Sequence, residues 1–389
     1  MPAGIGAARS EPLMRASGHI GTNAWAASRH RNVSLPALNP VTRDEIAIRC
    51  YRNGDERALT ALFETVFGRR MSEREWRWKL APTYKAPNVW LATHADEPVS
   101  HYAGMPTRFK IGERTGDVMV AVDAMTAPAF RRRGLLTEVV TRAHDAWRDA
   151  GVAFVIGLPN QQWGSRARAL GWRELFPMQW LARPLRPEAL IARRLGVPSL
   201  GKIRMFGAAW NRFANRRLRR RSEIEVTHAE SASEDFDVIW QRCRGDNAFS
   251  AVRDSTWIER RFLSSPTRTY RLLVALQGNR PTAWLAYTVN RSNGRTTAHL
   301  TELLAAEGDT ASCEALMFEL LRVLSDLDAD LVYTLALPGS ALFAWFRSVG
   351  FLRGPSFGLE LVPLTTDVPL ERLLNPRAWR LTGADFDVA

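Results

Sequence analysis

The stretch VAVDAMTAPAFRRRGLL, residues 120–136, decides how this chain of 389 residues is interpreted. It begins as an apolar strand that ends near Met125, and a short loop containing Pro128 follows. An amphipathic helix comes next, because the apolar residues between 135 and 147 recur at helical spacing. The stretch therefore predicts a strand, a tight loop and a helix that begins directly after a run of arginines.

The junction before this helix has the composition of an anion-binding site. Arg131, Arg132 and Arg133 precede Gly134, where the predicted helix begins. The first N–H groups of a helix have no intrahelical partner, and the helix dipole adds positive potential at that end. Gly134 allows a phosphate to approach the backbone closely. The alternative is an ordinary strand-to-helix turn whose arginines are solvated.

Strands and helices alternate on both sides of this junction. The predicted strands span residues 45–50, 89–93, 99–106, 117–125 and 152–157, and the predicted helices span residues 59–66, 72–80, 134–149 and 163–170. The strand at 152–157 is apolar and rich in β-branched residues, which is typical of a buried strand.

The arginine junction resembles the acetyl-CoA signature of the Gcn5-related N-acetyltransferase (GNAT) superfamily. In that signature, Arg/Gln-x-x-Gly-x-Gly/Ala follows the fourth strand and holds the CoA pyrophosphate. Arg131 and Gly134 match, whereas Leu136 stands at the last small position. A second motif follows in the expected order, with Asn160, then Ser165, then a Leu-Gly-Trp corner at residues 170–172.

The resemblance implies an α/β fold with a mixed central sheet flanked by helices, and an acyl-CoA N-acyltransferase activity. The co-substrate would be acetyl-CoA or another acyl-CoA, with no metal. The implied acyl-CoA-binding residues, which lie on the strand, the arginine junction and the second motif, are Met125, Arg131, Arg132, Arg133, Gly134, Leu135, Asn160 and Ser165.

The acid that many family members use is missing from this chain. The family often places a Tyr on the helix before the Leu-Gly-Phe corner, and alignment on that corner puts Ala167 there. The remaining candidates for catalytic base or acid are Asp123 on the fourth strand, and His101 and Tyr102 on the strand before it. A structural hydrogen-bonding role is the alternative for Asp123 and His101.

The second half repeats the same order of patterns more weakly, which predicts a tandem duplication. Pro159 and Gly171 are twelve residues apart, as are Pro338 and Gly350. The arginine junction has no counterpart, because acidic residues near Asp309 replace it. We therefore expect a flexible tail at 1–44, a GNAT domain at 45–185, a basic connector at 186–222, a degenerate GNAT-like domain at 223–365 and a C-terminal tail at 366–389.

The net charge of +13 is concentrated in the connector, where residues 183–222 carry twelve basic residues and one acid, Glu188. Ile203, Phe206, Trp210 and Phe213 form an apolar pattern at helical spacing. Three interpretations stay open: a linker helix packed on the domains, a helix at an anionic membrane surface through 203–221, or a site for an acidic partner. Nucleic acid is disfavoured, since no base-reading motif accompanies the arginines.

Composition limits the remaining possibilities. The three cysteines, Cys50, Cys243 and Cys313, are widely spaced and predict neither a disulfide framework nor a zinc site. No signal-peptide or membrane-spanning pattern is present. These features predict a cytoplasmic protein, peripheral at most at the inner membrane face.

The sequence does not name the amine, although a small molecule or an envelope precursor is favoured over histones. Two other functions stay open: a non-catalytic CoA-binding regulatory module, and a tandem-GNAT aminoacyl transferase that uses charged tRNA.

Overall fold

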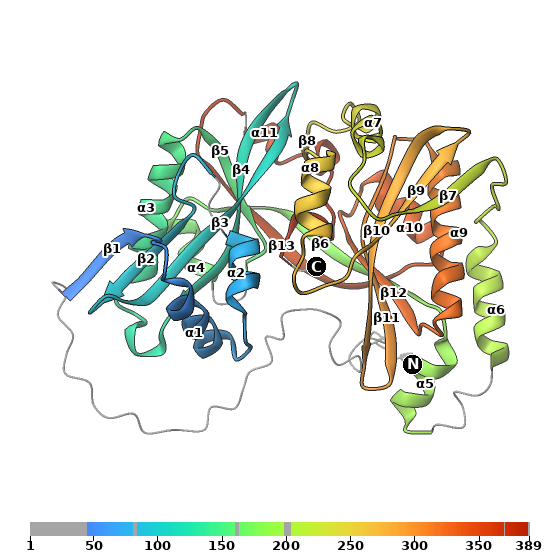
Figure 1. Ribbon diagram of the computed structural model, residues 1–389, viewed down its shortest axis with the longest axis horizontal. Coiled ribbons are helices and arrows are strands. Elements are labelled where there is room, and N and C mark those ends of the chain that lie inside the picture. Colours follow the sequence, from blue (N-terminus) through green and yellow to red (C-terminus); the bar gives the residue numbers. More distant parts are fainter. Residues whose placement is uncertain (1–44, 81–83, 160–162, 198–203, 369, 388–389) are drawn as a thin grey trace, which may run out of the picture.

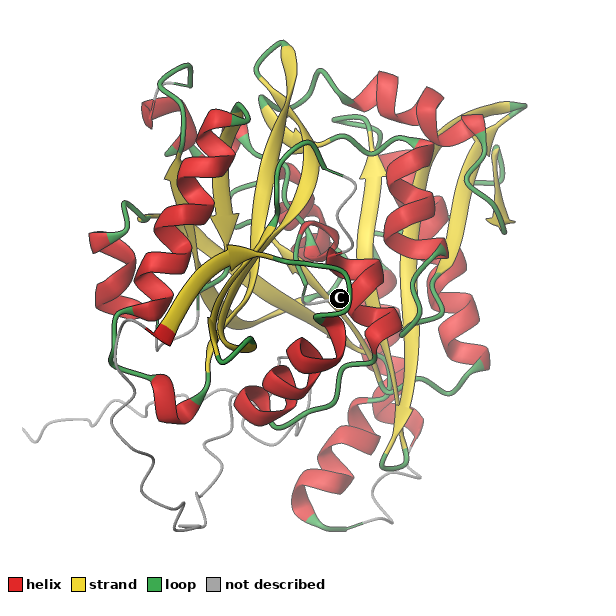
Figure 2. Cartoon of the chain, turned by 60° about the vertical axis from the view of Figure 1, so that its left-hand side comes forward, coloured by secondary structure: helices red, strands yellow, loops and turns green. Residues whose placement is uncertain are grey.

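The computed structural model describes residues 45–80, 84–159, 163–197, 204–368 and 370–387. The predicted tail at 1–44 lies outside the described residues. Figures 1 and 2 show one large twisted sheet with helices on both of its faces. The α/β architecture with a mixed central sheet, predicted from the sequence, is confirmed.

The two halves of the chain have the same order of elements, apart from one short extra strand. The first half contains β1 (Ile46–Cys50), α1 (Glu56–Phe67), α2 (Glu73–Leu80), β2 (Val89–His94), β3 (Glu97–Ile111), β4 (Arg114–Thr126), α3 (Leu135–Asp149), β5 (Val152–Gly157), α4 (Gly164–Ala169) and β6 (Arg173–Pro184). The connector contains α5 (Pro187–Leu195) and α6 (Arg204–Asn215).

The second half contains β7 (Ile224–Ala229), α7 (Glu234–Cys243), the extra strand β8 (Phe249–Ala251), α8 (Ser255–Ile258), β9 (Arg271–Gln277), β10 (Arg280–Ser292), β11 (Arg295–Ala305), α9 (Thr310–Asp326), β12 (Leu331–Ala336), α10 (Ala341–Ser348) and β13 (Leu352–Pro363). The short helix α11 (Leu370–Leu373) and two helical turns, Pro376–Ala378 and Gly383–Asp385, follow it.

The halves exchange their last strands. The strand order is β1-β2-β3-β4-β5-β13-β6-β12-β11-β10-β9-β7, and β8 pairs with β3. Thus β13 pairs with β5 of the first half, and β6 pairs with β12 of the second half. The pairs β4–β5 and β11–β12 are parallel, and the other pairs are antiparallel. The exchange covers the inner edge of each half, so that no strand edge is left open between them.

Helices cover both faces of each half. In the first half, α3 packs on one face with Tyr102 and Trp147, while α1 and α2 pack Leu59 and Trp76 on the other. A central cluster around Trp379 joins the halves, because Phe109 of β3 and Phe249 of β8 both belong to it. The predicted C-terminal tail at 366–389 is therefore a packed segment, as far as residue 387 is described.

Most predicted elements of the first half exist, and the differences lie at their ends. The strand predicted at 99–106 runs as far as Ile111, because its distal part pairs with β8. The long amphipathic helix begins at Leu135, and Gly134 caps it with a left-handed φ of 81°. Ser72 accepts a hydrogen bond from the backbone N–H of Glu75 at 3.1 Å and so caps the start of α2.

The predicted apolar stripe of the connector is divided in the structure. The side chains of Ile203 and Phe206 lie outside the described part. Trp210 faces inward and donates from Nε1 to the carbonyl of Pro184 at 2.8 Å, whereas Phe213 is exposed. The two aromatic residues are three positions apart on α6 and so point in similar directions. Trp210 lies on the packed side of the boundary between the inner and outer faces of the helix, and Phe213 lies on the exposed side.

Candidate active site

The site lies where β4 and β5 diverge. These strands pair in parallel only from Asp117–Val152 to Val120–Ile156, although β4 continues to Thr126. The last six residues of β4 are thus separated from β5. In the second half, β11 and β12 diverge in the same way after the pair His299–Tyr333.

A bulge interrupts the pairing of β4 with β3 inside this divergent segment. His101 pairs with Met125 and Ala103 pairs with Val122, so two β4 residues stand opposite one β3 residue. Asp123 has a positive φ of 50°, which is uncommon for a residue other than glycine. The bulge turns the backbone of β4 away from a regular ladder at Asp123.

The arginine loop stands at the end of this strand and leads into α3. Arg131, Arg132, Arg133 and Gly134 are exposed. The Nε of Arg131 donates to the carbonyl of Thr126 at 3.1 Å, which fastens the loop to the strand. Among the described residues, no side chain caps the N-terminus of α3. The geometry therefore leaves backbone N–H groups available for an anion beside guanidinium groups.

Asp123 is held by a buried lysine. The Nζ of Lys79 on α2 lies 2.9 and 2.8 Å from the two carboxylate oxygens of Asp123, and it also pairs with the carboxylate of Asp387. Burial would lower the pKa of Lys79, but the two carboxylates outweigh burial and raise its pKa. Lys79 is therefore charged at neutral pH and fixes the position of Asp123.

His101 supports the bulge from the β3 side. Its Nδ1 donates to the backbone carbonyl of Asp123 at 2.7 Å, since a carbonyl oxygen can only accept. Burial lowers the pKa of His101, so that the ring is neutral at neutral pH.

Tyr102 faces the opposite side of the sheet. Its hydroxyl group lies 3.1 Å from Nε2 of His144 on α3, and both side chains are buried. Burial raises the pKa of Tyr102 and lowers the pKa of His144 to about 4. The catalytic role predicted for His101 and Tyr102 stays a prediction. In this conformation their contacts are those of positioning groups.

Sequence reasoning did not single out Lys79, Glu75 or Asp387 as site residues. Burial raises the pKa of Glu75, which lies one helical turn before Lys79 on α2. Charge patterning on α2 alone gives no signal for these roles, because the partner carboxylates are distant in sequence.

The remaining predicted site residues differ in how far the structure describes them. Met125 and Leu135 are buried in the clusters on either face of the sheet, so only their backbones can line the gap. Ser165 belongs to α4, but its side chain is not among those that the structure describes. Asn160 lies outside the described residues. Ala167, at the position of the absent Tyr, is buried against α3.

In the second half, the chain itself fills the corresponding gap. The hydroxyl group of Thr382 donates to Glu302 of β11 at 2.8 Å, and Thr382 also bridges to Ala336 of β12. A Cβ on Gly383 would lie 3.2 Å from the ring of His299, so the segment fits closely between the diverging strands. The C-terminal segment therefore lies between β11 and β12, at the position that corresponds to the divergence of β4 and β5 beside the arginine loop.

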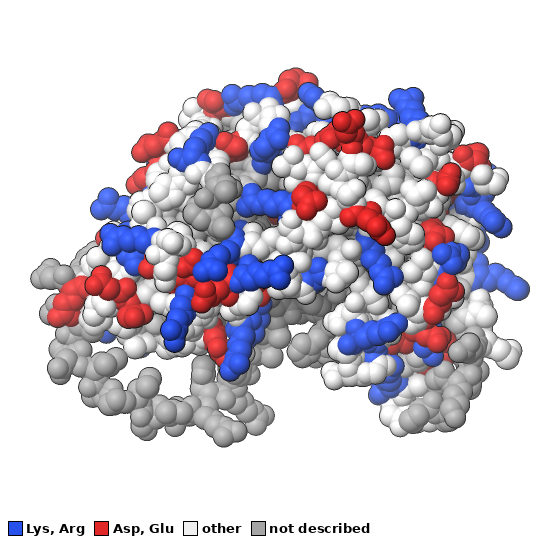
Figure 3. All heavy atoms as spheres, viewed as in Figure 1, with Lys and Arg blue, Asp and Glu red and all other residues white. Residues whose placement is uncertain are grey.

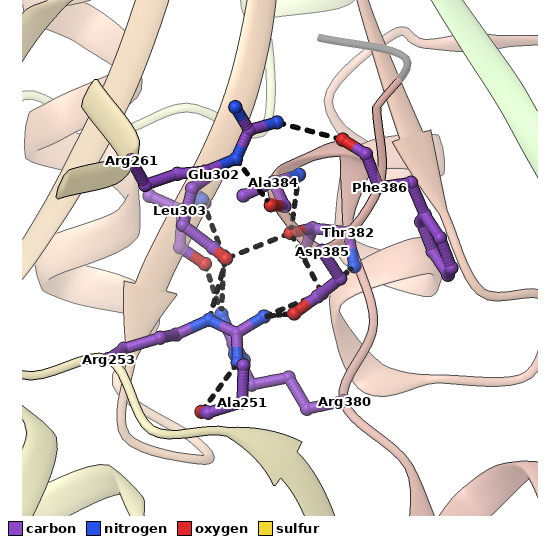
Figure 4. A network of polar contacts seen from close by, with 10 residues as sticks. All are labelled: Ala251, Arg253, Arg261, Glu302, Leu303, Arg380, Thr382, Ala384, Asp385 and Phe386. Carbon is purple, nitrogen blue, oxygen red and sulfur yellow. Dashed lines mark hydrogen bonds and ion pairs between the residues drawn. The ribbon is translucent and has the colours of Figure 1, made fainter. Parts of the chain in front are cut away.

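A buried ionic network holds this segment (Figure 4). Arg253 donates to Glu302 at 2.7 Å and to Asp385 at 2.8 and 3.0 Å. Arg380 pairs with Glu302 at 3.2 Å, and Arg261 donates to the carbonyl of Phe386 at 2.8 Å. At the start of α9, Asp309 accepts a hydrogen bond from the N–H of Ser312 at 3.0 Å and caps the helix.

These features lie within a part of the chain that is similar to a known protein family. Residues 47–174 match the family model described as an acetyltransferase (GNAT) domain. This part of the chain is similar to a GNAT domain. The match contains the diverging strands, the bulge at Asp123 and the arginine loop. The GNAT resemblance predicted from two short motifs is confirmed for this part of the chain.

Solved structures extend the likeness over most of the chain. A protein of unknown function from Enterococcus faecalis V583, described as a probable N-acyltransferase, has a TM-score of 0.61 at 9% identity and covers 82% of this chain and 73% of its own. A GCN5-related N-acetyltransferase from Anabaena variabilis has the same TM-score and coverages at 10% identity. One from Kribbella flavida has a TM-score of 0.56 at 13% identity, covering 81% and 70%. The TM-scores show a shared fold, and at such low identity they show the fold alone. A search of the curated proteins finds no match.

Two further features concern the described part of the chain. It holds no group of three or more His, Cys, Asp or Glu side chains arranged to bind a metal ion. None of its helices is both long and apolar enough to cross a membrane.

Proposed function

We propose that this protein is an N-acyltransferase that transfers an acetyl or other acyl group from acyl-CoA to a primary amine. One observation carries the proposal: the uncapped N-terminus of α3 follows three exposed arginines at the end of a strand that diverges from its neighbour. Uncapped N–H groups and guanidinium groups suit a pyrophosphate. The gap between β4 and β5 would receive the extended arm of the CoA.

The chemistry needs a deprotonated amine and a stabilised oxyanion. The amine nitrogen attacks the thioester carbon, a C–N bond forms, and the C–S bond breaks as CoA leaves as a thiol. Backbone N–H groups near the bulge of β4 would hold the carbonyl oxygen while it carries negative charge. Asp123 would accept the amine proton, directly or through one water molecule.

The charges around Asp123 favour a cationic acceptor. Lys79 is enclosed by the carboxylates of Asp123 and Asp387, and Glu75 lies one turn away on the same helix. Glu75 pairs with Arg69 at 3.7 Å. Asp123 and Asp387 around the single ammonium group of Lys79 still leave one negative charge in surplus, which attracts a protonated amine before it loses its proton. The acceptor would be a small-molecule amine or an amine of an envelope precursor.

We further propose that the chain is a tandem duplication whose second half binds no acyl-CoA. The repeated order of elements and the exchanged strands support the duplication. The loop before α9 lacks arginines, and Thr382 fills the gap between β11 and β12. The second half would instead complete the sheet of the first half and border the acceptor cleft.

A thiol-release assay tests the proposed reaction. The full chain would be incubated with acetyl-CoA and a panel of polyamines, amino sugars and envelope-precursor amines. With a productive amine, Asp123→Asn is expected to lower kcat about 100-fold or more, while the affinity for acetyl-CoA is retained. Asp149→Asn, on the exposed C-terminal end of α3, serves as the matched control.

Two results would contradict the proposal. Release at the wild-type rate by Asp123→Asn would remove Asp123 from the chemistry. Binding of acetyl-CoA without release for any amine would favour a CoA-binding regulatory module instead.

A further inference from the structure

Exposed apolar side chains gather on the connector between the halves. Met205 is 80% exposed, Leu195 is 61% exposed and Phe213 is 54% exposed. Ile191 on α5 and Val197, two residues after α5, are also exposed. Only four other large apolar side chains of the described residues are comparably exposed, and they are scattered over the rest of the chain. A concentration of this kind marks an interaction surface.

The inner face of α6 is already used for packing. Gly207, Trp210, Asn211 and Ala214 recur at helical spacing and face the protein. Asn211 donates to the carbonyl of Leu185 at 2.9 Å, and a Cβ on Gly350 would lie 2.7 Å from Cβ of Ala214. The helix is therefore fixed on the second half, and its other side remains exposed.

The outer face of α6 combines apolar and basic side chains. Met205, Ala209, Arg212, Phe213 and Arg216 follow one another on this face, and all five are exposed. The guanidinium group of Arg216 lies 4.2 Å from the centre of the Phe213 ring. A helix with apolar and basic residues on one exposed face is suited to a membrane interface, where apolar groups enter the lipid and arginines remain at the headgroups.

The charge of this region favours an anionic partner. Exposed arginines flank the apolar side chains on both segments: Arg194, Arg212, Arg216, Arg217, Arg219 and Arg220. Glu188 is the only acid of residues 183–222, and it is buried against Gly207. Figure 1 shows α5 and α6 at the outer end of the second half, and in Figure 3 the basic side chains at this end lie among uncharged and acidic ones.

We propose that the end of α5 and the outer face of α6 form a docking surface for an anionic lipid bilayer. Three exposed apolar side chains favour lipid over nucleic acid, because Met205 and Leu195 cannot stack on bases. Each arginine near an anionic surface strengthens binding about fivefold, and the apolar side chains add their own burial. This surface is independent of acyl transfer, so it can exist whether or not the proposed reaction is correct.

Sedimentation with vesicles tests the surface, using the full chain. The probes are vesicles of phosphatidylcholine alone and of phosphatidylcholine with phosphatidylglycerol. The protein is expected to sediment only with the anionic vesicles and to dissociate at 1 M salt, where the screening length falls from about 10 Å at 0.1 M to about 3 Å. The triple variant Leu195→Ser, Met205→Ser and Phe213→Ser should bind at least about tenfold more weakly.

Two further variants separate lipid insertion from general effects. Phe318→Ser on α9 removes an apolar side chain that is 42% exposed outside the connector, and it should bind as the wild type does. Arg212→Glu with Arg216→Glu should abolish binding. Unfolding midpoints close to the wild-type value would show that all variants are folded.

The proposal is overturned by any of three results: no sedimentation of the wild type with anionic vesicles, equal binding by the triple variant and the wild type, or binding to a nucleic-acid oligonucleotide in the absence of binding to vesicles.

Discussion

At the level of single residues, the candidate site is surrounded by ionisable groups whose charge the fold fixes. Lys79 is buried and charged between two carboxylates, whereas His101 and His144 are buried and neutral. Lys79 and His101 contact Asp123 at the bulge of β4, whereas His144 contacts Tyr102 on the other face of the sheet. They also make the stability of the protein depend on pH.

Acidification is expected to destabilise the protein through its buried histidines. The folded-state pKa of His144 is about 4, below the unfolded value of about 6.5. The unfolded chain therefore binds this proton first as the pH falls, and stability is lost between about pH 6.5 and pH 4. His299, with a pKa of about 3, acts in the same direction.

The contribution of His144 can be measured by urea unfolding at pH 7 and pH 5. His144→Gln keeps a partner for Tyr102 but cannot titrate. It should reduce the loss of stability between these two pH values by about 2 kcal/mol. His228→Gln, which removes an exposed histidine, is the matched control. A pH dependence in His144→Gln that equals that of the wild type would contradict the assignment.

The arginine loop could be predicted from sequence because its parts are consecutive. Arg131, Arg132, Arg133 and Gly134 adjoin one another, and helix geometry turns that order into a site. The contacts of Asp123 could not be predicted in this way. Lys79 is 44 residues from Asp123 and 308 residues from Asp387, and only the packing of α2 and the C-terminal segment brings the three together.

At the level of elements, the two diverging strand pairs differ in what lies beside them. The gap beside β4 adjoins an exposed basic loop, whereas the gap beside β11 is filled by residues 380–386. The filling depends on Arg253, which is fully buried between Glu302 and Asp385. The sequence indicated that acidic residues near Asp309 replace the arginine junction, but it did not indicate that the C-terminal segment fills the space between β11 and β12.

Removal of Arg253 should release this segment. Arg253→Met leaves Glu302 and Asp385 buried without their main counterion, which is expected to cost about 3–5 kcal/mol of unfolding free energy. Urea unfolding measures the loss, and hydrogen exchange of residues 380–386 reports the local opening.

Arg322→Met provides the control for this prediction. It removes an arginine that forms exposed ion pairs on α9, and it should leave stability almost unchanged. Similar losses for the two variants would show that the buried network does not hold the segment.

At the level of the whole molecule, the exchanged strands join the halves into one sheet. The sequence boundary near residue 185 coincides with the end of β6, yet β6 pairs with β12 and β13 in space. Local patterns cannot show such an exchange, because either partner would bury the same apolar strand. The order of the elements could therefore be predicted from the sequence. The pairing of β6 with β12 and of β13 with β5 could not.

The exchange predicts that neither half folds alone. A fragment of residues 45–222 retains β6 but lacks β12 and β13, so β5 becomes an open edge. It should aggregate or self-associate, and refolding with residues 223–389 should restore a one-to-one complex. Size-exclusion chromatography with light scattering distinguishes these states. A stable, monomeric, folded 45–222 fragment would contradict the prediction.

The central claim is that the arginine loop and the N-terminus of α3 bind acyl-CoA. Calorimetric titration with acetyl-CoA tests it most directly, using the wild type, Arg131→Glu with Arg133→Glu, and Arg142→Glu as a control two turns along the same helix. We predict micromolar binding by the wild type and the control, and its loss in the double variant. If the wild type binds none of acetyl-CoA, longer acyl-CoA and free CoA, the account of the site is wrong.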